Sequence, residues 1–118
     1  MPSARSDASA LNIPDVGILV VGGLIRDSRA SVKSNKAELL VKDSARASGW
    51  RWIELKPMLK ARQRPGIANF RGYVVVVGGD EEVTAECIPL PSIEQTEDQW
   101  TQLHGFCEHM QHYRGRCI

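Results

Sequence analysis

The side chains best suited to chemistry gather in the last fifteen residues of this 118-residue chain. All three histidines lie there, and Cys107, His109, His112 and Cys117 are residue types that ligate zinc. Their C-x-H-x2-H-x4-C spacing matches no common structural zinc site, so we predict neither a metal nor a cofactor. The sequence nowhere assembles a nucleophile, a base and an oxyanion site. We therefore expect no enzyme and assign no catalytic residue.

Length and composition favour one small soluble domain, with 42% hydrophobic and 25% charged residues. The net charge of +1 gives no general reason to expect a nucleic-acid or membrane partner. No apolar run approaches the ~20 residues of a transmembrane helix, and the first ten residues lack the apolar stretch of a secretory signal. Three cysteines are too few for a disulfide framework and favour a reducing compartment. We expect a cytoplasmic protein.

Charge is unevenly distributed along the chain. Residues 24–64 carry eleven lysines and arginines against four acidic residues, whereas residues 65–105 carry one arginine against seven acidic residues. Two oppositely charged surfaces can attract each other within the molecule, or the basic segment can bind an acidic partner. Charge alone does not separate these two interpretations.

Three landmarks occur twice in the same order, which indicates an internal repeat. Val-Val-Gly-Gly ends an apolar run at residues 20–23 and again at residues 76–79. An Ala-Glu pair follows each run, ending at Glu38 and Glu86, and Trp52 or Trp100 then follows at the same distance from its glutamate. The interval between the two glycine pairs is longer than the interval between the two glutamates. The first copy therefore carries an insertion after its glycines.

The segments around these landmarks have the pattern of short β strands. β-branched runs that stop at a glycine pair are typical of buried strands. Pro89 and Pro91 restrict one strand to a sheet edge or shorten it. Residues 1–15 are expected to be a flexible lead. The predicted strands cover residues 17–21, 36–43, 50–55, 66–70, 73–77, 84–90 and 99–103.

The repeated pattern resembles the kelch repeat, in which a double glycine closes the second strand of a four-stranded blade and an aromatic residue opens the fourth. The residues that carry the resemblance are Gly22, Gly23, Ala37, Glu38, Trp52, Leu55, Met58 and Arg62, then Gly78, Gly79, Ala85, Glu86, Trp100 and Leu103. The resemblance implies an all-β fold. It implies a partial kelch β-propeller of about two four-stranded antiparallel blades, the first lacking its innermost strand.

This interpretation divides the chain into four parts. They are a flexible lead at residues 1–15, kelch repeat 1 at 16–61, kelch repeat 2 at 62–106 and an irregular tail at 107–118. A closed propeller needs more blades than two, so we expect a fragment of a larger propeller or a chain that self-associates. The structural residues of the repeat are expected to be Gly22, Gly23, Glu38, Trp52, Arg62, Gly78, Gly79, Glu86 and Trp100.

The resemblance also implies a function in protein–protein interaction. Kelch propellers of the BTB-kelch class serve as the substrate-recognition part of cullin-RING ubiquitin ligase adaptors, and others bind actin. The partner is thus expected to be a ubiquitination substrate or actin, unless the chain is an inactive truncated fragment. By position in the repeat, the partner-binding residues are Leu24, Ile25, Arg26, Arg29, Gln63, Asp80 and Glu81.

Overall fold

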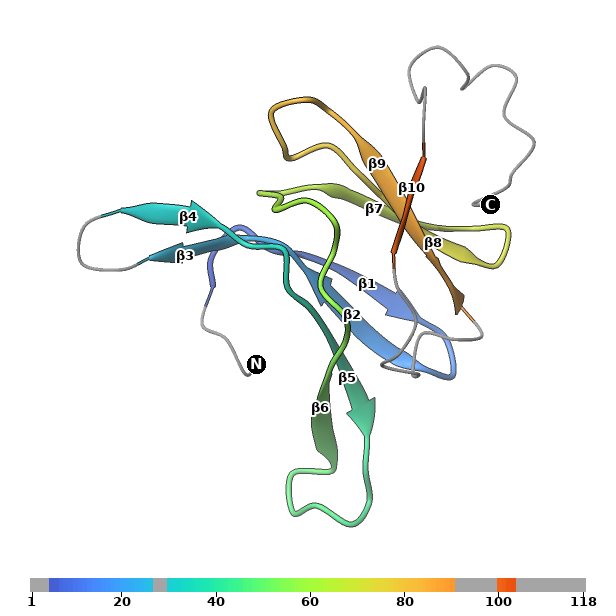
Figure 1. The fold of residues 1–118 in the computed structure, drawn as a ribbon. Coiled ribbons are helices and arrows are strands. Elements are labelled where there is room, and N and C mark those ends of the chain that lie inside the picture. Colours follow the sequence, from blue (N-terminus) through green and yellow to red (C-terminus); the bar gives the residue numbers. More distant parts are fainter. Residues whose placement is uncertain (1–4, 27–29, 91–99, 104–118) are drawn as a thin grey trace.

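The computed structural model describes residues 5–26, 30–90 and 100–103, and these residues form antiparallel strands with no α-helix (Figure 1). The predicted all-β class is confirmed. A first sheet has the strand order β1-β2-β5-β6, a second sheet has the order β10-β9-β8-β7, and β3 and β4 form a separate hairpin. The bounds are β1 Ser9–Ile13, β2 Gly17–Val21, β3 Leu24–Arg26, β4 Ser31–Lys33, β5 Ala37–Lys42, β6 Trp50–Glu54, β7 Gly66–Phe70, β8 Tyr73–Val77, β9 Ala85–Pro89 and β10 Thr101–Leu103.

The first sheet has an opening strand that the sequence analysis did not predict. β1 pairs along its whole length with β2, from Ser9 opposite Val21 to Ile13 opposite Gly17. A tight turn joins the two strands, with the Val16 amide donating to the Ile13 carbonyl at 3.0 Å. The expectation that residues 1–15 form a lead and that this sheet lacks its innermost strand was therefore wrong. Leu11 and Ile13 alternate with the exposed residues Ala10 and Asn12, and Ile13 is buried against the core, which is sufficient for a strand beside β2.

The second sheet follows the predicted strands closely. β7 and β8 are joined at Arg71 and Gly72, which both have positive φ, as the commonest two-residue hairpin turn requires. β9 pairs with β8 from Ala85 to Pro89 and ends there. Pro89 has no amide hydrogen to donate, and it lies opposite Tyr73, the first residue of β8, so the pairing ends there.

The hairpin of β3 and β4 fills most of the insertion in the first repeat. Leu24 pairs with Lys33 and Ile25 with Val32. Figure 1 shows the hairpin projecting away from both sheets. The insertion thus contains two paired strands, which flank residues 27–29; these three residues lie outside the described part of the chain.

The hydrophobic core lies between the two sheets. Leu19, Val21 and Leu39 project from one face of the first sheet and are completely buried, and Val74 and Val76 meet them from the second sheet. Successive residues of a strand point to opposite faces. The neighbouring residues Ile18, Val20 and Leu40 therefore lie on the other side of the first sheet, which we call its outer face, and are only half-buried. Each fully buried Val or Leu contributes roughly 1.5–3 kcal/mol.

Candidate interaction site

A buried arginine organises the entry into the second sheet. Arg62 is completely buried, and its Nη2 lies 2.9 Å from Oε2 of Glu86 on β9, with its Nε at 3.1 Å from the same oxygen. Its Nη1 donates to the carbonyl oxygens of Gly78 and Thr84, both at 2.8 Å. A charge-assisted cluster of this kind fixes the turn after β8 against the segment that leads into β7. Arg62 thus serves as the structural hydrogen-bond donor that the sequence suggested.

Asp80 belongs to the same cluster and faces inward. Its side chain is 8% exposed, with Oδ1 at 3.1 Å from Nη1 of Arg62 and Oδ2 accepting a hydrogen bond of 2.6 Å from the Thr84 hydroxyl. Burial opposes the charged form, but the hydrogen bonds from Thr84 and the positive charge of Arg62 act in the opposite direction, and the net effect is a lowered pKa of Asp80. The sequence placed Asp80 among the partner-binding residues, whereas this carboxylate is engaged inside the protein.

The first sheet has a counterpart of Arg62 that sequence reasoning missed. Arg5 and Glu38 form an ion pair whose side chains are both completely buried, and Nη1 of Arg5 donates to the Lys36 carbonyl at 3.2 Å. Arg5 precedes Arg62 by nearly the same interval that separates the two glycine pairs. This spacing could have identified Arg5 as the counterpart of Arg62 from the sequence alone.

The double glycines allow the chain to approach itself closely at two points. A Cβ at Gly22 would lie 2.4 Å from the carbonyl oxygen of Arg62, and one at Gly79 would lie 2.6 Å from that of Gln63. Both glycines also have positive φ, of 70° and 76°. Both turns therefore contact the segment at Arg62 and Gln63, which brings the candidate binding residues of the two repeats to one edge.

Asp7, in the first repeat, contacts two residues at the start of the second repeat. Its carboxylate accepts a hydrogen bond from Nε2 of Gln63 at 3.0 Å and pairs with Nη2 of Arg64 at 2.9 Å. The hydrogen bond from Gln63, and then that from Arg64, lowers the pKa of Asp7. The Nε2 group of the Gln63 side chain is thus already hydrogen-bonded to Asp7. Sequence reasoning did not single out Asp7, because its partners lie far away along the chain, in the second repeat.

The β3–β4 hairpin provides the exposed part of the edge. Ile25 and Val32 are opposite each other and are 36% and 55% exposed. Arg26 and Lys33 lie on the other face of the hairpin, and neither forms a salt bridge within the described residues. We call Ile25, Arg26, Val32 and Lys33 the hairpin patch.

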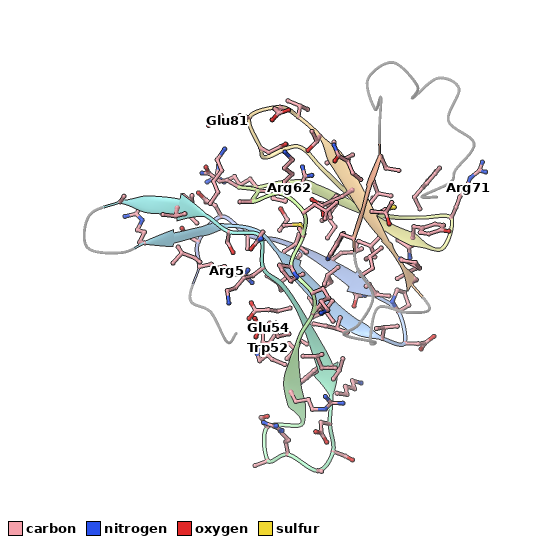
Figure 2. The ribbon with its side chains drawn as sticks, in the orientation of Figure 1. Arg5, Trp52, Glu54, Arg62, Arg71 and Glu81 are labelled. Atoms are coloured by element: carbon pink, nitrogen blue, oxygen red, sulfur yellow. The ribbon has the colours of Figure 1, made fainter. Side chains whose placement is uncertain are left out.

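The remaining candidates differ in their surroundings. Leu24 is half-buried and its amide donates to the Ser6 carbonyl at 2.6 Å, which fixes the base of the hairpin. Glu81 is exposed on the turn after Gly79 (Figure 2). Arg29 and all four tail residues considered as zinc ligands lie outside the described residues.

The described part of the chain offers little other chemistry. It contains no cluster of three or more metal-ligating side chains. No helix among these residues has the length and apolar character needed to cross a membrane. Cys87 is buried and disulfide-bonded, which differs from the expectation that the cysteines are reduced.

No family model matches the chain, and no curated protein sequence is significantly similar to it. These comparisons therefore add no support to the kelch resemblance.

Proposed function

We propose that this chain is a kelch-like protein-interaction module, with the two four-stranded sheets as successive blades of a partial β-propeller. The support is the repeated architecture. Val20 pairs with Glu38 in the first sheet as Val76 pairs with Glu86 in the second, and each glutamate binds a buried arginine. The kelch resemblance extends the proposal to substrate recognition in a cullin-RING ubiquitin ligase, with actin binding as the alternative.

The observation that carries the interaction role is the hairpin patch. Two apolar side chains and two cations stand on a hairpin that projects from the sheets (Figure 1). The neighbouring candidates are held in place, because Gln63 and Leu24 are fixed by Asp7 and Ser6. Because the apolar pair and the two cations lie on opposite faces of the narrow hairpin, the hairpin favours an acidic partner segment that carries an apolar residue and contacts both faces.

Binding of a short peptide rich in Glu and Asp, with one central Leu, tests the proposal. We expect the double variant Arg26→Glu, Lys33→Glu to lower its affinity roughly tenfold and to weaken the dependence on salt. Lys42→Glu is the matched control, because Lys42 is an exposed lysine on β5, outside the patch. Equal affinity and salt dependence in all three proteins would refute the role of the patch.

Co-sedimentation with filamentous actin separates the two partner classes. Co-sedimentation that the double variant loses and Lys42→Glu keeps would favour actin as the acidic partner. Peptide binding without actin co-sedimentation would favour the substrate-recognition role.

A further inference from the structure

The turn between β8 and β9 carries exposed acidic side chains next to an exposed apolar one. Glu81, Glu82 and Val83 are all exposed, and Val83 is 54% exposed. Within the described residues, Glu81 forms no ion pair. Glu82 forms a long one there, at 3.9 Å, with Lys60 of the segment that connects the two sheets, and both side chains of this pair are exposed. We call residues 81–83 the acidic turn.

The base of the acidic turn is fixed by the Arg62 cluster. Asp80 accepts hydrogen bonds from the amide and the hydroxyl of Thr84, at 3.1 and 2.6 Å, and pairs with Arg62. Val83 has a φ of 51°, which is a genuine outlier for a β-branched residue, and it does not belong to the hydrophobic core. Backbone strain of this kind is a feature of functional sites. Val83 is therefore a candidate contact residue.

The hairpin patch has the chemistry that complements the acidic turn. Ile25 and Val32 are exposed apolar residues, and Arg26 and Lys33 are cations on the other face of the narrow hairpin. Within the described residues, no ion pair joins either cation to a carboxylate of the acidic turn. Figure 1 shows the hairpin and the turn after β8 as two separate projections, and Figure 2 places Glu81 on the latter. Both surfaces are therefore open to a contact from outside the molecule.

We propose that the hairpin patch of one copy of this chain binds the acidic turn of a second copy. The inference rests on the proposed function, because it assigns an occupant to the same patch. In this contact Val83 packs on Ile25 and Val32. The long, flexible side chains of Arg26 and Lys33 reach around the edge of the hairpin to the two glutamates of the turn.

A second copy is favoured as the occupant because the chain itself presents the segment that the patch requires. The acidic turn carries one exposed apolar residue, and its base is held by Asp80 and Arg62, so little conformational freedom is lost on binding. Residues 24–64 are strongly basic and residues 65–105 strongly acidic, which favours contact between the patch of one molecule and the turn of another. An external acidic partner would compete for the same patch.

The contact joins two different surfaces of the molecule. A pair of copies can therefore exchange it reciprocally, or further copies can add. Two short projections form a small contact, below the roughly 1,200 Å² at which stable interfaces begin. We expect a weak association that rises with protein concentration and falls with salt.

Exchanging the charges of the two surfaces tests the contact at constant net charge. Sedimentation equilibrium of the full chain should show self-association weakened at least about tenfold in the patch variant Arg26→Glu, Lys33→Glu and in the turn variant Glu81→Lys, Glu82→Lys. The charge-exchanged variant, which combines all of these changes, should regain association. Glu54→Lys is the matched control with an expected change below about threefold, because Glu54 is an exposed carboxylate on β6 with a similarly long ion pair to a lysine.

The variant Val83→Asn tests the apolar part of the contact without any change in charge. Asparagine adopts positive φ more readily than valine, so this variant should keep or gain thermal stability. Its self-association should nevertheless weaken roughly threefold to tenfold, because the apolar contact is lost. Unchanged association would overturn the role of Val83. Should the charge-exchanged variant fail to fold, Val83→Asn alone decides.

Peptide binding distinguishes failure of this inference from failure of the proposed function. The turn variant keeps the native patch, so it should bind the peptide rich in Glu and Asp, and this peptide should dissociate the parent assembly. A parent protein that binds the peptide but stays monomeric up to about 1 mM would overturn the second-copy contact alone. A turn variant that associates like the parent, or a folded charge-exchanged variant without recovery, would also overturn it. Self-association that recovers on charge exchange, without peptide binding, would support the contact and refute the peptide partner.

Discussion

Arg62 and Glu86 form a completely buried ion pair, with Nη2 and Oε2 2.9 Å apart, at the point where the connecting segment enters the second sheet. The Glu86 carboxylate also accepts the amides of Leu59 and Lys60. Arg5 and Glu38 repeat the ion pair in the first sheet, where none of the described residues donates a backbone amide to Glu38. The two repeats thus share a buried arginine–glutamate pair, but the two glutamate carboxylates differ in how many hydrogen bonds they accept from the described residues.

Glu86→Gln should destabilise the protein more than Glu38→Gln does. Both changes disrupt a buried ion pair, which costs about 3–5 kcal/mol when one partner is left uncompensated. Glu86→Gln additionally weakens the acceptor for two amides, so we expect its effect to be larger by about 1–3 kcal/mol. Urea unfolding followed by circular dichroism measures the difference. Equal losses for the two variants would contradict the unequal roles of the two carboxylates.

Gly79→Ala should be much more destabilising than Gly78→Ala. The two glycines have φ of 76° and 74°, so each alanine incurs a left-handed backbone cost of about 1–2 kcal/mol. Only at position 79 does the new Cβ also meet backbone, 2.6 Å from the Gln63 carbonyl oxygen, whereas nothing lies within 4 Å at position 78. Thermal unfolding compares the two. A smaller loss of thermal stability for Gly79→Ala than for Gly78→Ala would contradict the close approach of the two backbones at Gly79.

Trp100→Phe should destabilise the protein by about 1–3 kcal/mol and Trp52→Phe by less than about 1 kcal/mol. Trp100 is 3% exposed and its indole binds the Lys56 carbonyl, so phenylalanine loses packing and leaves that carbonyl without its donor. Trp52 is half-buried on the outer face. Chemical denaturation of the two single variants gives the comparison. The reverse order would show that the outer face, and not the connecting segment, carries the larger stabilisation.

Acid should remove the stabilisation that Asp80 provides. Its folded-state pKa lies below the ordinary value of 3.8, so between the two values the unfolded state binds more protons and stability falls as the pH falls. The contribution is fully present above about pH 5 and declines below it. The variant Asp80→Asn should therefore have a lower free energy of unfolding than the parent protein at neutral pH. The difference between the two proteins should shrink as the pH falls toward about 2. Denaturation midpoints across this range measure the effect, and a constant difference would contradict it.

Much of the fold was predictable because the repeat marks it with strong local signals. The glycine pairs end β2 and β8, where the chain needs positive φ beside another backbone, and the apolar runs before them are long enough to identify strands. β1 was missed because its alternation is weak. Only Leu11 and Ile13 face the core, and its stability comes from pairing with β2, which no local pattern reveals.

The candidate site was predictable only in part. Position in the repeat singled out Ile25, Arg26 and Gln63; the first two lie on the exposed β3–β4 hairpin and Gln63 is hydrogen-bonded to Asp7, while their role in binding stays a prediction. The inward orientation of Asp80 depends on Arg62 and Thr84, and the role of Asp7 depends on residues of the other repeat. Long-range ion pairs of this kind follow from how two sheets meet, which composition and spacing do not specify.

A nuclear magnetic resonance titration with the acidic peptide tests the central claim, the binding role of the hairpin patch, most directly. We expect saturable amide shifts at residues 24–26 and 31–33, with smaller ones at Gln63 and Glu81, and their loss in the double variant Arg26→Glu, Lys33→Glu. Shifts confined instead to the outer face around Leu40 and Trp52, or to the hollow formed by residues 12–18 with Trp50 and Arg51, would contradict the proposed function.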